Sequence, residues 1–178
     1  MSFMEKLNLN LFKFILIFFL TLSNLAFSET KIISYNAIEV GVTDGDSLRF
    51  GKERIRLFGI DAPEIKQICN DKFKKPYACG EEAKKNLDEF ILSASAAKKK
   101  IYCYYSERDK YNRILGECFW GETKKININR FMVLFGHAIA YLRYSDKYLD
   151  DQEIAKAIKL GLWQGDFDMP EDWRKKNK

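Results

Sequence analysis

Two cysteines constrain the fold of this chain most directly. Cys103 and Cys118 lie in the apolar-rich segments IYCYY and ILGECFW, which flank the polar stretch ERDKYNR. A β-hairpin centred between Lys110 and Tyr111 places the two cysteines opposite each other, at a Cα separation that a disulfide accepts. The sequence therefore predicts a hairpin closed by a Cys103–Cys118 disulfide.

The other two cysteines, Cys69 and Cys79, close the short loop CNDKFKKPYAC if they also pair. An even number of cysteines without the CxxC spacing of a zinc site favours disulfides and an oxidising compartment. We therefore expect a Cys69–Cys79 disulfide in an exported protein.

The first 28 residues have the pattern of a signal peptide. Lys6 and Lys13 precede an apolar run over 14–22, and small residues follow near Ser28. The run is about half of the ~20 residues that a membrane-spanning helix needs. We expect residues 1–28 to be cleaved near Ser28 and the protein to be secreted or periplasmic. An uncleaved membrane anchor is the alternative.

The remaining chain reads as one α+β domain over 29–167. β-formers dominate 32–58, with a turn at Gly51-Lys52, and the cysteine hairpin adds two more strands. Helical patterning recurs at 80–94, 128–135 and 150–160. Five strands with helices after the third and the fifth predict a five-stranded Greek-key OB-fold β-barrel with about three helices. Residues 168–178 read as a polar, basic tail, docked through Trp173 and otherwise loose.

The composition excludes several kinds of enzyme. His137 is the only histidine, so paired-histidine, HExxH and Ser-His-Asp chemistries are poorly supported, and we interpret it as structural. No P-loop or Rossmann glycine pattern is present. The formal net charge of +5 is compatible with a polyanionic substrate but does not identify one. Catalysis would have to come from carboxylates, arginines, tyrosines and a metal.

The stretch VTDGDSLRFGKERIRLFGIDAPE supplies such residues. DGD and DAPE could each be a turn. On a hairpin about Gly51-Lys52, however, Asp46 and Asp61 converge, and like charges so close require a cation. Oxygen ligands without histidine or cysteine favour calcium or magnesium. Glu64 is placed to act as a base beside the metal, and Arg56 could hold an anionic group.

The motifs DGDS, RIRLFGIDAPE and DKYNR, in this order, resemble those of the staphylococcal nuclease (thermonuclease) family. The resemblance runs from about residue 32 to 163. The cysteine loop, YLRYSD, GLW and the terminal PxDWR are similar to an exported bacterial branch. The resemblance implies an OB-fold enzyme that uses Ca²⁺ to cut DNA and RNA and leaves 3′-phosphate ends.

The resemblance also implies roles for individual residues. Asp46, Asp61 and the backbone carbonyl of Ala62 match the calcium ligands, and Asp44 matches a nearby supporting acid.

Three further residues match the catalytic set. Arg56 and Arg113 match the arginines that grip the scissile phosphate, where guanidinium groups stabilise developing charge. Glu64 matches the residue assigned as general base.

Substrate-binding roles follow from the same resemblance. Lys110 and Tyr111 match residues that contact a terminal phosphate. Tyr144 aligns with one member of a base-stacking tyrosine pair, whereas Leu142 falls where the other would be and Tyr141 lies one position earlier. Tyr141 and Tyr144 are also compatible with a core role.

We therefore expect a monomeric calcium-dependent nuclease that acts on single-stranded DNA and RNA. We expect no stable protein partner, and association with a membrane only if the leader remains uncleaved. A non-catalytic nucleic-acid-binding OB-fold module is the alternative, and a calcium-binding structural domain of the envelope is a weaker one. Retention of the full catalytic set favours the nuclease.

Overall fold

The computed structural model describes residues 29–177 apart from 122, 124 and 125. The predicted signal peptide, 1–28, lies outside this part of the chain. Within the described residues, no helix is long and apolar enough to cross a membrane.

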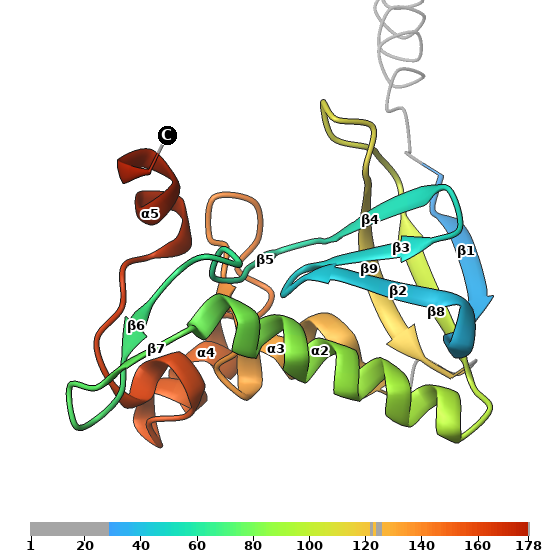
Figure 1. The fold of residues 1–178 in the computed structure, drawn as a ribbon. Coiled ribbons are helices and arrows are strands. Elements are labelled where there is room, and N and C mark those ends of the chain that lie inside the picture. Colours follow the sequence, from blue (N-terminus) through green and yellow to red (C-terminus); the bar gives the residue numbers. More distant parts are fainter. Residues whose placement is uncertain (1–28, 122, 124–125, 178) are drawn as a thin grey trace, which may run out of the picture.

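A seven-stranded mixed sheet forms one end of the molecule (Figure 1). Its order is β1-β8-β9-β4-β3-β2, with β10 added beside β9. Neighbouring strands are antiparallel except β4 and β9, which run parallel. The strands are β1 (Lys31–Asn36), β2 (Val40–Asp44), β3 (Ser47–Phe50), β4 (Glu53–Leu57), β8 (Lys100–Tyr105), β9 (Ile114–Trp120) and β10 (Ile126–Asn127).

The sheet has two strands more than the sequence predicts. The first predicted strand is broken into β1 and β2 by a short 3₁₀ turn, η1 (Ala37–Glu39), whose Ala37 is buried and donates to the carbonyl of Lys99 at 2.9 Å. The second addition is β10, which pairs with the end of β9. The break falls at Asn36 and Ala37, which are weak strand formers, and β10 has only two residues.

The predicted hairpin register is confirmed. Cys103 pairs directly with Cys118 across β8 and β9, and the two form a disulfide. The second predicted disulfide, Cys69–Cys79, is also present. It lies beside a two-residue ladder between β6 (Cys69–Asn70) and β7 (Pro76–Tyr77).

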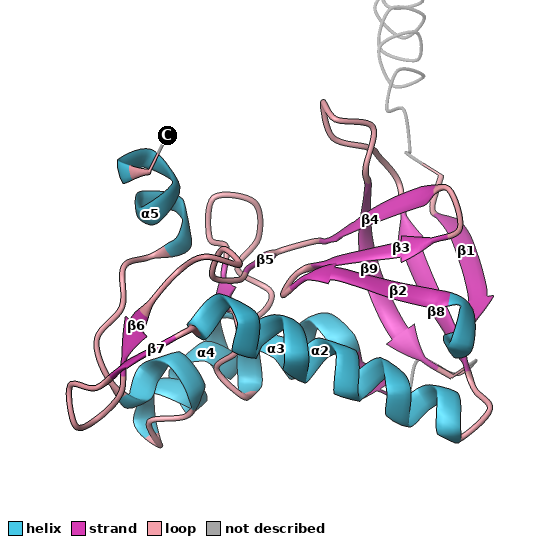
Figure 2. Cartoon of the chain, viewed as in Figure 1, coloured by secondary structure: helices cyan, strands magenta, loops and turns pink. Residues whose placement is uncertain are grey.

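The helices lie along one side of the molecule and at the end away from the sheet (Figure 2). Helix α2 packs against the sheet through side chains that recur at helical spacing, including the fully buried Leu87 and Ala94. All three predicted helices are present, although α4 ends three residues earlier than predicted. The helices are α2 (Cys79–Ala96), α3 (Ile128–Leu134), α4 (Leu149–Ala157) and α5 (Pro170–Lys176), with a 3₁₀ turn η2 (Gly161–Gln164).

Helix α5 corrects the expectation of a loose tail. Pro170 occupies the first turn, where its missing N–H costs nothing. Acidic residues follow in the first turn and basic residues in the last turn, which complements the helix dipole. The tail is therefore ordered as a short helix.

Asn129 joins the strands that carry the candidate site to α3. Its fully buried side chain accepts from the amide of Cys118 at 3.0 Å and donates to the carbonyls of Phe58 and Gly116 at 2.9 and 3.1 Å. All three of its amide contacts are to backbone groups. The residue fixes the end of β4 relative to β9.

Candidate active site

Asp46 and Asp61 converge on Arg56. The carbonyl of Asp46 accepts from the amide of Leu57 at 2.8 Å, which places it at the end of the β3–β4 ladder. Asp61 lies in β5 (Ile60–Asp61), which pairs with β11 (Ile139–Ala140). Arg56 donates through Nη1 to Asp46 Oδ1 and through Nη2 to Asp61 Oδ1, the latter at 2.6 Å. The predicted convergence is confirmed.

Close backbone packing holds Asp46 in this position. Gly45 allows it, because a Cβ there would lie 2.7 Å from the Cβ of Ala62 and 2.9 Å from that of Ala83. The amide of Ala62 donates to Asp46 Oδ2 at 2.9 Å. Asp44 Oδ1 accepts from the amide of Asp46 at 3.1 Å. The glycine of DGD is thus required by the site and not only by a turn.

Burial makes these charges interdependent. Asp46 is 2% exposed and Asp61 is 0% exposed. Burial raises the pKa of Asp46 to about 7, although the charge of Arg56 opposes the shift. For Arg56, burial alone would lower the pKa, but the charges of Asp46 and Asp61 raise it above the ordinary value. The pair of aspartates therefore requires a cation.

The donor set fits a hard divalent cation with few protein ligands. In the described part of the chain, no group of three or more His, Cys, Asp or Glu side chains is arranged to hold a metal. Asp46 and Asp61 supply only oxygen, are buried, and already hold a cationic group between them. Calcium accepts carboxylate, carbonyl and water oxygens, so backbone, water or substrate oxygens would complete the set.

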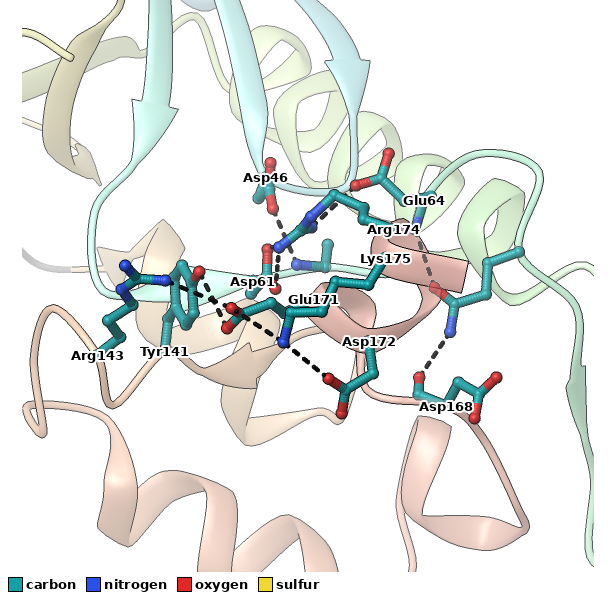
Figure 3. Close-up of polar contacts among 12 residues, drawn as sticks. Asp46, Asp61, Glu64, Tyr141, Arg143, Asp168, Glu171, Asp172, Arg174 and Lys175 are labelled. Atoms are coloured by element: carbon teal, nitrogen blue, oxygen red, sulfur yellow. Dashed lines mark hydrogen bonds and ion pairs between the residues drawn. The ribbon is translucent and has the colours of Figure 1, made fainter. Parts of the chain in front are cut away.

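Arg174, on α5, is a site residue that the sequence analysis missed. Its Nη1 donates to Asp61 Oδ1 at 3.0 Å and to Glu64 Oε1 at 2.9 Å, and its Nη2 donates to Asp61 Oδ2 at 2.9 Å (Figure 3). Burial would lower the pKa of Arg174, but the bonds to these carboxylates raise it above its ordinary value. The signal was present in the sequence, because PEDWRKK has the proline and charge order of a short helix.

The rest of α5 is attached beside the site. Gln67, which is fully buried, donates to the carbonyl of Asp168 at 2.7 Å and accepts from the amide of Glu64 at 3.2 Å. Glu171 accepts from the hydroxyl of Tyr141 at 3.3 Å (Figure 3). The tail is therefore connected both to Glu64 and to a predicted base-stacking residue.

A cleft of about 690 Å³ is lined by Arg56 and Arg174, which contact the buried aspartates; Asp46 and Asp61 themselves do not line it. Arg56 and Arg113 both line it, because the parallel pairing of β4 with β9 brings Arg56 beside Leu115. Arg113 is held by Asp109, which accepts from its Nε at 2.7 Å. The predicted residues that line this cleft are Asp44, Arg56, Glu64, Lys110, Tyr111, Arg113, Tyr141 and Tyr144.

The aromatic side chains of the cleft are placed to meet a ligand. Tyr141 and Tyr144 form an edge-on pair with ring centroids 5.0 Å apart, and Tyr144 is 59% exposed. Tyr111 is also exposed, with Lys110 Nζ 5.0 Å from its ring. Neither Tyr111 nor Tyr144 is therefore a core residue.

His137 does not line this cleft. It lies near Phe131, with ring centroids 6.0 Å apart, and burial lowers its pKa to about 4. It is neutral near pH 7, which agrees with the structural interpretation.

Fold and site together define an α+β protein with an arginine-lined cleft, one of whose arginines pairs with buried carboxylates. The family model "Staphylococcal nuclease homologue" matches residues 54–165. An uncharacterized endonuclease of Haemophilus influenzae is 33% identical over 147 residues, which is 78% of this chain and 72% of that protein. The chain therefore belongs to the staphylococcal nuclease family, and the predicted OB-fold class is confirmed.

Two other relatives show the range of names among similar proteins. A micrococcal nuclease of Shigella flexneri is 31% identical over 155 residues, which is 78% of this chain and 80% of that protein. The succinoglycan biosynthesis protein ExoI of Rhizobium meliloti is 33% identical over 129 residues, and the match covers 71% of this chain and 63% of that protein. The family and the relatives named nuclease or endonuclease support a nuclease function at the level of the family.

Proposed function

We propose that the protein is an exported, calcium-dependent nuclease that hydrolyses DNA and RNA to 3′-phosphate products. The observation that supports this most is that Arg56, Glu64 and Arg113 line one cleft and that Arg56 pairs with the buried Asp46 and Asp61. A module that only binds nucleic acid has no need for two buried acids paired with an arginine of the cleft. The non-catalytic alternative is therefore less well supported.

Calcium, held by Asp46, Asp61 and the carbonyl of Ala62, would place positive charge beside the scissile phosphate. Arg56 would add to that charge, because its guanidinium lines the same cleft and carries five N–H donors for phosphate oxygens. Arg113 would bind the phosphate from the neighbouring strand, in an orientation that Asp109 fixes.

Glu64 would act as the general base. It would accept a proton from the water whose oxygen forms the new bond to phosphorus. The bond from phosphorus to the 5′-oxygen would break, and the leaving oxygen would take a proton from solvent. The products would be a 3′-phosphate and a 5′-hydroxyl. Positioned charge of this kind contributes several kcal/mol to catalysis.

Tyr144 and Tyr141 would hold the substrate strand by stacking with bases, and Lys110 and Tyr111 would contact a terminal phosphate. Base–aromatic stacking tolerates any base and favours single-stranded substrates. This supports single-stranded DNA and RNA as substrates without a strong sequence preference.

Export is supported by the leader pattern of residues 1–28 and by the two disulfides. Amino-terminal sequencing of the protein recovered from outside the cytoplasm tests this proposal. We expect a new terminus near Glu29. An intact leader in a membrane fraction would instead support the anchor.

The decisive experiment measures cleavage of single-stranded DNA and RNA by the purified, oxidised protein, with calcium or with a chelator. We expect cleavage only with calcium, and products whose ends become extendable after phosphatase treatment. Arg56→Ala should lower turnover by about 10²–10³-fold, as expected for loss of a group that stabilises the transition state.

Arg49→Ala is the matched control, because Arg49 is an exposed arginine of the same hairpin that does not line the cleft. It should leave turnover unchanged. Undiminished cleavage in chelator would contradict the calcium assignment. Calcium-dependent DNA binding without cleavage would favour the binding module, and calcium binding unaffected by DNA would favour a structural domain.

A further inference from the structure

Helix α5 contacts the proposed site through two of its residues. Arg174 reaches Asp61 and Glu64, and Glu171 reaches Tyr141 (Figure 3). These contacts fall on a proposed metal ligand, the proposed general base and a proposed base-stacking residue. The side chains of the helix thus contact three residues with different proposed roles in the site.

The hydrogen bonds on Asp61 leave little room for another cation. Its Oδ1 accepts from Arg56 and Arg174, and its Oδ2 accepts from Arg174. A carboxylate oxygen offers about two acceptor positions, so Oδ1 is fully used. Asp46 Oδ1 is used in the same way, by Arg56 and by the hydroxyl of Ser47.

Arg174 and a divalent cation therefore require the same oxygens. Arg174 also holds Glu64, whose carboxylate the proposed mechanism needs free to accept a proton. Two cations placed within a few ångströms repel each other, most strongly where water is excluded. Binding of a metal at Asp61 must weaken the hold of Arg174.

We propose that Arg174 is an internal cation that competes with calcium for Asp61 and Glu64, and that α5 is a latch that opens when calcium binds. This inference rests on the proposed calcium site. The latch raises the calcium concentration that is needed to fill the metal site, because calcium must displace the bound guanidinium of Arg174. Opening also frees the hydroxyl of Tyr141 from Glu171.

The attachment of α5 is suited to such opening. The helix has seven residues, and Pro170 is its buried residue. The Arg174 side chain is partly exposed, and Lys175 and Lys176 face solvent. Short elements with little buried surface open at low free-energy cost.

The first test is a calcium titration of the full protein by calorimetry. We expect Arg174→Gln to bind calcium about 10-fold more tightly than the wild type. Lys175→Gln is the matched control, because it removes the same charge from the same helix but has no contact with Asp61 or Glu64 among the described interactions. It should change the affinity less than about twofold. Equal or weaker calcium binding by Arg174→Gln would overturn the latch.

The second test needs no variant. Hydrogen exchange of the wild-type amides over 170–177 is measured with and without saturating calcium, and cleavage is assayed on the same samples. We expect faster exchange with calcium. Calcium-dependent cleavage with unchanged or slower exchange would overturn the latch and leave the proposed function intact. Faster exchange without cleavage would support the latch and count against the proposed nuclease.

Discussion

The side chain of Gln67 bonds to the carbonyl of Asp168, 101 residues away, at 2.7 Å, and accepts from the amide of Glu64 at 3.2 Å. One buried amide thus connects the loop that carries the proposed general base to the segment that leads into α5. The Cys69–Cys79 disulfide begins two residues further along the same loop.

Gln67→Met is expected to destabilise the protein by about 2 kcal/mol, because it leaves the Glu64 amide and the Asp168 carbonyl without this partner at similar side-chain volume. Denaturant unfolding measures the change. Lys66→Met, at the exposed neighbouring position, should stay within about 0.5 kcal/mol of the wild type. Similar values for the two variants would mean that the amide is not a structural link.

Arg56→Ala should destabilise the protein by about 3 kcal/mol in a chelator, because it leaves buried Asp46 and Asp61 with one cation fewer. Calcium should restore much of this loss, since it binds the folded state through the same carboxylates. Thermal unfolding with calcium and with chelator gives the comparison. An equal loss in both conditions would argue against a metal at these aspartates.

Tyr144→Ala should weaken binding of single-stranded DNA by about 1–3 kcal/mol through loss of base stacking. Leu142→Ala provides a matched control, because the two side chains are 59% and 55% exposed and lie two residues apart. Fluorescence anisotropy with a labelled oligonucleotide distinguishes them. If Leu142→Ala had the larger effect, the assignment of Tyr144 would be wrong.

Replacing Cys69 and Cys79 together by alanine should cost about 2–4 kcal/mol of stability, because the open loop gains conformational entropy when the chain unfolds. The same replacement at Cys103 and Cys118 should cost at least as much, since that loop is longer and both cysteines are fully buried. Unfolding curves of the two double variants test this order. A smaller loss at Cys103 and Cys118 would contradict it.

His137 should make stability depend on pH between about 4 and 6.5. Its pKa is about 4 in the folded protein and 6.5 in the reference state, so the unfolded chain binds more protons in this window. Stability should therefore fall as the pH decreases, by about 2–3 kcal/mol at the lower limit. His137→Gln should show a flatter pH profile in denaturant titrations, and an unchanged slope would contradict the assignment.

Several features could be predicted because they depend on local spacing or strand register. The distance of each cysteine from the hairpin turn places Cys103 opposite Cys118. The Gly51-Lys52 turn similarly brings Asp46 to the end of the strand that leads to Asp61. Helix α2 follows from apolar residues at helical intervals. In each case, the regular geometry of one strand pair or one helix fixes which residues lie next to each other, so their spacing in the sequence is enough to predict the contact.

The break of the first strand at η1 could not be predicted in this way. β-Formers lie on both sides of Asn36 and Ala37, and the ladder is interrupted where the Ala37 amide donates to the Lys99 carbonyl and the Asn36 amide donates to the Glu39 carboxylate. Tertiary contact overrides local propensity at such positions. The same limitation applies to the exposed placement of Tyr144, which the sequence leaves open between core and cleft.

The sequence by itself determined the acids, the arginines and the register that brings Asp46, Arg56 and Asp61 together. Only the tertiary structure decided that Arg174 also reaches Asp61, from 113 residues away. A polar helix with charges on its surface can pair with any exposed acid, and its sequence does not specify which one. The path of the chain through α4 and η2, and the bond from Gln67 to Asp168, select that partner.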